Sequence, residues 1–182
     1  MTASTEEPLL ATYPEANTLR MERVLTGPIE RVWQYLTDAE LRGKWLAAGP
    51  MELRAGGRVE MTWANDTLSP LPDEVPEKQV GARSSMQGTV VACDPPRMIR
   101  YEWQIGVDAT EVTFELSPAG ENVLLRLTHR RVTVPATLQG VSIGWQSHLD
   151  VLADVLEGKT PRPFWKNFTA LKERYTVLLA GK

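Results

Sequence analysis

The chain has 182 residues, of which 42% are hydrophobic and 24% charged, with a formal net charge of −3, as in one ordinary globular domain. The slight acidity argues against a nucleic-acid binder, and no stretch approaches the ~18 consecutive apolar residues of a membrane span. Cys93 is the single cysteine, which excludes an intrachain disulfide and, with a polar N-terminus, favours a cytoplasmic protein.

The chain divides by composition into three parts. Residues 1–16 lack periodicity and are expected to form a flexible tail, residues 17–160 one domain, and residues 161–182 a helical extension of that domain. At the start of the domain, alternating apolar residues from Leu19 to Leu25 predict a strand.

Two short helices are expected next. Pro28 suits the first turn of a helix, and apolar spacing predicts that this helix covers 28–37. Asp38 is a typical N-cap residue for a second short helix, which carries Leu41 and Trp45.

Period-two alternation then predicts a run of strands joined by short turns, which is typical of an antiparallel meander. After a strand end at Met51 and Leu53, the residues assigned to one face are Val59, Met61 and Trp63; Met86, Gly88, Val90 and Ala92; Ile99, Tyr101 and Trp103; Val112, Phe114 and Leu116; and Val123, Leu125 and Leu127. The proline-rich segment 64–80 interrupts them. We expect it to be a mobile flap near a cavity entrance.

Two helices complete the chain. The first is expected to start near Ser142 and to end before Gly158, with one apolar stripe made of Trp145, Leu149, Leu152 and Leu156. The second is expected over 163–180. Its stripe of Phe164, Phe168, Leu171, Tyr175 and Leu178 is too apolar to remain in water. It must therefore cover its own subunit or meet a partner, and we expect a homodimer contact, because the long helix already occupies the concave face of the sheet.

Several short motifs in this order resemble one family. They are Pro28-Ile29-Glu30-Arg31-Val32-Trp33, Lys44-Trp45, Gly56-Gly57, Gly88-Thr89-Val90-Val91, Asp94-Pro95-Pro96, Tyr101-Glu102-Trp103 and Gly144-Trp145. Over about residues 18–158 the chain is similar to the proteins named after the activator of the heat shock protein 90 ATPase, in the START-like superfamily of the birch-pollen allergen and polyketide cyclases. The resemblance implies an α+β helix-grip fold, in which a curved antiparallel sheet wraps around a long helix and leaves an internal cavity.

The candidate site follows from the residues expected to face that cavity. They are Trp45, Met61, Trp63, Met86, Tyr101, Trp103, His129, Trp145, His148, Leu149 and Leu152. Tryptophan offers a large apolar surface and one N–H donor, which suits a planar ligand or plain core packing. His129 shares the parity of Leu125 and Leu127, so it either orients a ligand or acts as a general base, or it is a core histidine bonded to the backbone.

Three functions remain open at this stage. The leading hypothesis is a binding protein for a small apolar or aromatic molecule, without cofactor, metal or catalytic residues. The second is a cyclase- or hydrolase-type enzyme that uses His129, Tyr101 or a carboxylate in the same cavity. The third is an interaction module acting on a chaperone. An apolar cavity would favour the carrier, converging polar groups the enzyme, and a filled interior beside an exposed apolar patch the module.

Overall fold

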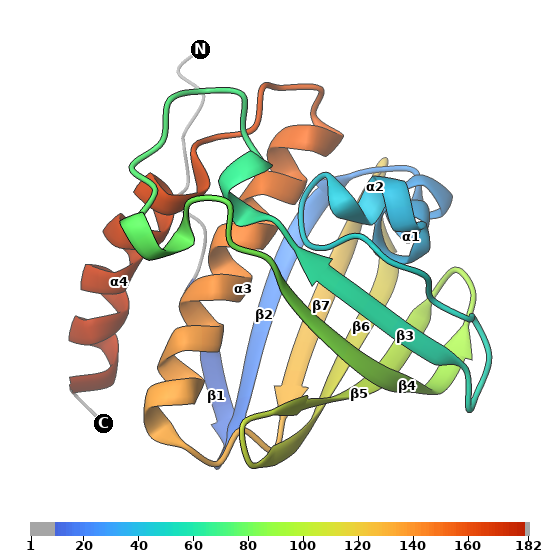
Figure 1. Cartoon of the computed structure of the whole chain (residues 1–182). Coiled ribbons are helices and arrows are strands. Elements are labelled where there is room, and N and C mark those ends of the chain that lie inside the picture. Colours follow the sequence, from blue (N-terminus) through green and yellow to red (C-terminus); the bar gives the residue numbers. More distant parts are fainter. Residues whose placement is uncertain (1–9, 181–182) are drawn as a thin grey trace.

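The computed structural model describes residues 10–180 and has the expected α+β helix-grip architecture. Seven antiparallel strands form one sheet in the order β1-β2-β7-β6-β5-β4-β3. The strands are β1 (Thr12–Glu15), β2 (Thr18–Thr26), β3 (Arg58–Trp63), β4 (Ser84–Asp94), β5 (Met98–Ile105), β6 (Asp108–Ala119) and β7 (Asn122–Arg130). Figure 1 shows the sheet curving around helix α3 (Pro135–Leu156), which lies across its concave face.

The two short helices after β2 form as expected and sit at one end of the sheet. They are α1 (Ile29–Thr37) and α2 (Ala39–Gly43), and the Asp38 side chain caps α2 by accepting hydrogen bonds from two of its backbone amides. Arg42 of α2 is fully buried and donates to the carbonyl groups of Ala47 and Thr37, both at 3.1 Å. These bonds fix the segment that carries Trp45 and Leu46 against the sheet.

Helix α3 is longer than expected. It begins at Pro135 rather than near Ser142, because proline is favourable in a first helical turn, and its apolar stripe extends back through Leu138 and Val141, which pack against the core. The four expected apolar residues, Trp145, Leu149, Leu152 and Leu156, are all buried against the sheet. Gly158 has φ +71°, the left-handed conformation expected just beyond a helix end.

Two local expectations are wrong. Residues 12–15 are not part of a flexible tail, because they form the edge strand β1 on β2, while residues 1–9 lie outside the described residues. In β4, a bulge between Val90 and Ala92 shifts the register, so that Cys93 rather than Ala92 lies opposite the buried Ile99. An extra residue of this kind reverses the alternation without leaving a signal in the hydrophobic pattern. Met51 makes only an isolated bridge to Val59.

Helix α4 (Phe164–Ala180) packs beside α3 within the same chain (Figure 1). Phe164, Leu171 and Tyr175 of its stripe are buried, and Phe168 and Leu178 pack against the same core. The stripe is therefore covered by its own chain, and a homodimer contact through this helix stays a prediction.

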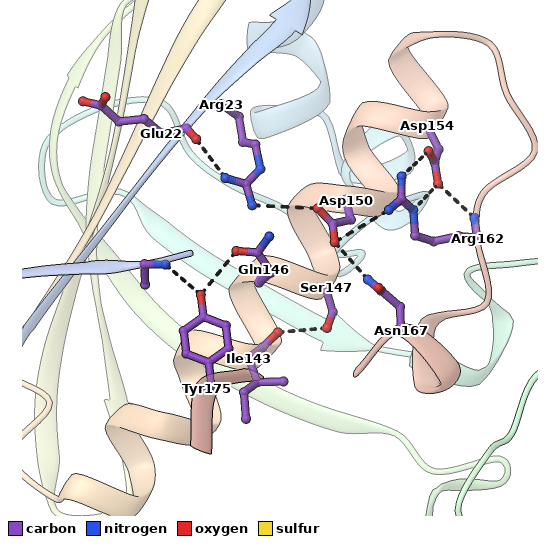
Figure 2. A network of polar contacts seen from close by, with 11 residues as sticks. Glu22, Arg23, Ile143, Gln146, Ser147, Asp150, Asp154, Arg162, Asn167 and Tyr175 are labelled. Atoms are coloured by element: carbon purple, nitrogen blue, oxygen red, sulfur yellow. Dashed lines mark hydrogen bonds and ion pairs between the residues drawn. The ribbon is translucent and has the colours of Figure 1, made fainter. Parts of the chain in front are cut away.

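A buried polar network joins α4 and the preceding turn to α3 and β2. Figure 2 shows Asp150 of α3 between Arg23 of β2 and Arg162, with N···O distances of 3.8 Å on both sides, and Asn167 donating to it at 3.0 Å. Arg162 also forms two side-chain hydrogen bonds of 2.7 Å with Asp154. The Tyr175 hydroxyl accepts from the Ala11 amide at 2.8 Å. This network holds the extension in place.

The segment 64–80 is irregular apart from two short 3-10 turns, Asn65–Thr67 and Glu77–Gln79. Asp73 accepts hydrogen bonds of 2.9 Å from the Trp165 and Lys166 amides, and so caps the N-terminus of α4 from a distant part of the chain. The segment leaves the sheet directly after Trp63 and is tied to α4. Its mobility stays a prediction.

Within residues 10–180, no helix has the length and apolarity required to cross a bilayer. The same residues contain no group of three or more His, Cys, Asp and Glu side chains that could hold a metal ion.

Candidate functional site

An apolar pocket of about 200 Å³ opens between the N-terminal half of α3 and the strands β3 and β5. Its lining consists of Leu46, Trp63, Trp103, Gly140, Val141, Gly144, Trp145 and His148. The volume is small, since pockets for drug-sized ligands span roughly 300–1,000 Å³, whereas an apolar cavity of roughly 150 Å³ accepts benzene. The space therefore suits a molecule of one or two aromatic rings.

One face of α3 forms the length of the pocket wall. Gly140, Gly144 and His148 are spaced four residues apart, so they lie above one another on the helix. Gly140 is exposed, Gly144 is half-buried and His148 is buried, so this row runs from the mouth of the pocket to its inner end.

Neither the space around the two glycines nor their backbone conformation requires glycine at these positions. A Cβ atom added at Gly140 or Gly144 would meet no atom within 4 Å, and neither residue has a positive φ. A glycine inside a helix destabilises it by roughly 0.5–1 kcal/mol relative to alanine. The helix thus carries two unfavourable residues where side chains would fill the pocket.

Aromatic rings form the opposite wall and the layer behind it. Trp103 of β5 stacks on Trp145 of α3 with ring centroids 5.8 Å apart, and it meets Trp63 of β3 edge-on at 5.7 Å. Behind them, Tyr101 and Phe114 complete the layer, each within 6.4 Å of the next ring. The interior beneath the pocket is filled by this cluster.

His129 belongs to that filled layer rather than to the pocket. The Trp145 indole N–H donates to its Nδ1 at 3.0 Å, which leaves the proton on Nε2. Burial lowers the pKa of His129 to about 3, so the imidazole is neutral at physiological pH. Its Nε2–H has no hydrogen-bond partner among the described residues, and the Trp103 ring lies beside it, with centroids 5.2 Å apart.

His148 is held in a different way, at the inner end of the pocket. Its Nδ1 lies 2.7 Å from the Trp45 carbonyl oxygen, which can only accept, so Nδ1 carries the proton. Phe164 of α4 packs against the ring from behind, with centroids 4.7 Å apart. Burial lowers the pKa of His148 to about 4, although the hydrogen bond to Trp45 acts in the opposite direction.

Of the eleven residues expected to face a cavity, the structure places four in the pocket lining: Trp63, Trp103, Trp145 and His148. The other seven, Trp45, Met61, Met86, Tyr101, His129, Leu149 and Leu152, lie in or against the hydrophobic core outside that lining. Strand parity, which applies to Met61, Met86, Tyr101 and His129, and the helix stripe, which applies to Leu149 and Leu152, both indicate which side of an element faces the interior. Neither pattern distinguishes a side chain that borders a space from one that fills it.

Sequence reasoning did not select Leu46, Gly140, Val141 and Gly144 as lining residues. The two glycines did leave a signal, because a spacing of four residues inside a helix places both on the same face, one turn apart. Leu46 follows Trp45 in an irregular segment, where no periodicity indicates direction.

The curved sheet, the gripped helix and the small apolar pocket between them define a START-like protein. The family model described as "Activator of Hsp90 ATPase homolog 1-like protein" matches residues 26–157, and the chain belongs to this family. No curated protein matches the chain.

Solved structures agree with this assignment. The protein encoded by gene BPP1335 of Bordetella parapertussis is 36% identical, with a TM-score of 0.76 over 97% of this chain and 94% of that one. CalU16 of Micromonospora echinospora is 22% identical, with a TM-score of 0.65 over 90% and 88% of the two chains. DynU16, from the dynemicin biosynthetic locus, is 20% identical, with a TM-score of 0.62 over 83% of this chain and 51% of that one. At these lower identities the likeness concerns the fold.

Proposed function

We propose that this protein binds a small, largely apolar aromatic molecule in the pocket between α3 and strands β3 and β5. The observation that carries the proposal is the pair of helix glycines, Gly140 and Gly144. Each destabilises α3 at a position where a side chain would meet only the space of the pocket. A protein that did not use this space would gain stability by filling it.

The rings around the space suit such a ligand. Trp63 and Trp103 are half-buried, so each keeps part of its surface at the pocket, and the third tryptophan of the lining, Trp145, has its N–H bonded to His129. An apolar ring that enters the pocket leaves water and contacts other aromatic rings. The hydrophobic effect then stabilises the complex by about 25 cal/mol for each Å² of apolar surface that is buried. The proposal involves a free small molecule, no cofactor and a cytoplasmic setting.

The geometry does not favour an enzyme that uses His129 or Tyr101. Both side chains are fully buried, and neither lines the pocket. Burial also raises the pKa of the Tyr101 hydroxyl, which keeps it protonated. A substrate in the pocket would be separated from both groups by the stacked Trp103 and Trp145 rings.

An interaction module also finds little support. The large apolar side chains that are well exposed, such as Val24 on β2, Val107 in the β5–β6 turn and Val177 on α4, come from separate elements. Single exposed apolar residues of this kind are normal on a folded protein.

The test is a titration with naphthalene followed by intrinsic tryptophan fluorescence, with Gly144→Leu as the blocked variant. Naphthalene should alter the emission of the wild type saturably, and Gly144→Leu should bind at least about tenfold more weakly because the new side chain occupies the space. Gly144→Leu should also unfold at a denaturant concentration no lower than the wild type, because the glycine penalty is removed.

Ala136→Leu is the matched control, since it adds the same side chain at an exposed position in the first turn of α3. It should leave naphthalene binding unchanged. Equal binding by Gly144→Leu and the wild type, or no saturable signal with naphthalene, would exclude this pocket as the binding site.

A further inference from the structure

The inner end of the pocket contains one polar group that the fold itself leaves available. His148 uses Nδ1 to donate to the Trp45 carbonyl oxygen at 2.7 Å. A neutral imidazole protonated at Nδ1 has an unprotonated Nε2, which can only accept a hydrogen bond. Within residues 10–180, no group donates to this Nε2.

The surroundings of His148 are mostly apolar and leave the side chain little contact with solvent. The residue is 6% exposed, and the groups around it at the inner end are the apolar Leu46 and the ring of Phe164. An acceptor in such surroundings gains more from a hydrogen bond than it would in water, and loses more when it has none.

The other polar groups of the lining offer a ligand neither a well-shielded hydrogen-bond donor nor a positive charge. Trp145 already donates its N–H to His129 at 3.0 Å, so this indole offers a ligand only its ring. Trp63 and Trp103 are half-buried, where solvent competes for their N–H groups. The lining contains no lysine or arginine, so a carboxylate or phenolate in the pocket would have no counter-charge.

We propose that the pocket selects small neutral aromatic molecules that carry a hydrogen-bond donor, such as a phenolic hydroxyl or a ring N–H, and that Nε2 of His148 accepts this hydrogen bond. The inference rests on the proposed function, and it adds a chemical class to it. The ligand enters between Gly140 and the tryptophan rings and places its donor at the buried end of the helix row formed by Gly140, Gly144 and His148.

The experiment compares four probes of the same ring system: naphthalene, 2-naphthol, 2-methoxynaphthalene and 2-naphthoate. At pH 7, 2-naphthol should bind about three- to tenfold more tightly than naphthalene, the range expected for one net hydrogen bond. The methyl ether, which has no donor, should show no such advantage. The anionic 2-naphthoate should bind at least about tenfold more weakly than 2-naphthol.

His148→Asn removes the acceptor at the position of Nε2, because the shorter side chain does not reach it, while the side-chain amide N–H can still donate to the Trp45 carbonyl. In this variant, naphthalene and 2-naphthol should bind equally. Leu46→Val is the matched control, because it trims the same end of the pocket without changing the acceptor, so 2-naphthol should keep its advantage over naphthalene.

The ¹⁵N resonance of His148 Nε2 gives a direct reading in the wild type, which is informative even where the variant does not fold. It should move on addition of 2-naphthol and remain in place with naphthalene. If naphthalene binds and 2-naphthol is no tighter, or if the advantage persists in His148→Asn, the role of His148 is overturned while the pocket stands. If none of the probes binds, the proposed function fails together with this inference.

Discussion

The two long faces of α3 are both buried, but their ionisable side chains have different partners. On the face toward α4, Asp150 and Asp154 are tied to arginines and to Asn167. On the face toward the sheet, apolar residues dominate, and the exception, His148, leaves one acceptor open beside the pocket. The carboxylates of Asp150 and Asp154 hold α4 against α3, whereas Nε2 of His148 takes no part in holding the fold together.

This difference has a physical basis in the cost of burying polar groups. A carboxylate is tolerated in an interior only with counter-charges and donors, and the α4 face supplies both. A neutral imidazole has a much smaller cost of burial and can keep one unpartnered lone pair at the edge of a cavity. A single open acceptor is therefore compatible with stability at the pocket, whereas an unpaired Asp150 would not be.

The largest expected effect is on the α4 face. Asp150→Ala removes the negative charge that faces the buried guanidinium of Arg23, and it should lower the free energy of unfolding by about 3–5 kcal/mol, as measured by urea denaturation. Glu22→Ala is the control, because its pair with Arg126 is exposed, and it should cost less than about 1 kcal/mol. Equal effects of the two variants would show that the network contributes no more than a surface ion pair.

An effect of similar size is expected on the sheet face when the pH falls. Burial lowers the pKa values of His129 and His148 to about 3 and about 4, while the unfolded chain takes up both protons near its usual pKa of 6.5. Because the unfolded state then binds more protons, stability is retained above pH 6.5 and lost as the pH falls toward 4. At pH 5 the loss should be about 4 kcal/mol for both histidines together.

His148→Asn separates the contribution of one histidine from that of the other. The variant should lose about half as much stability between pH 7 and pH 5, because only His129 still resists protonation in the folded state. Urea denaturation at pH 7, 6 and 5 measures this slope. A slope as steep as that of the wild type would mean that His148 does not stay neutral in the folded protein.

The smallest effect concerns the contact that orders the segment 64–80. Asp73→Ala removes the cap that this segment supplies to α4, and it should cost about 1 kcal/mol and increase hydrogen exchange at the Trp165 and Lys166 amides. Glu74→Ala is the neighbouring exposed control and should change neither quantity. Rapid exchange throughout 64–80 in the wild type would confirm that the segment is mobile despite this anchor.

Much of the fold was present in the sequence, because apolar periodicity reports which face of an element is buried. It identified strands β2–β7, the two short helices and the buried stripe of α3, and it placed Trp63, Trp103 and Trp145 on converging faces. The one charged residue that interrupts the apolar alternation of β2 is also explained by the structure, since Arg23 points inward and pairs with Asp150.

The site was predictable only as a region. Four of the eleven expected residues line the pocket, and the deciding feature of its wall is the absence of side chains at Gly140 and Gly144. Hydrophobic patterns record where side chains are buried, so the space itself left a signal only in the four-residue spacing of these two glycines.

What the sequence by itself determined is therefore the identity and direction of the elements, which depend on residues close together along the chain. Only the tertiary structure decided the bulge in β4, the burial of the α4 stripe within its own chain and the proton position on His148. That proton is fixed by a carbonyl group 103 residues away in sequence, at Trp45. Partners and cavities of this kind arise between distant segments, and no local period along the chain encodes them.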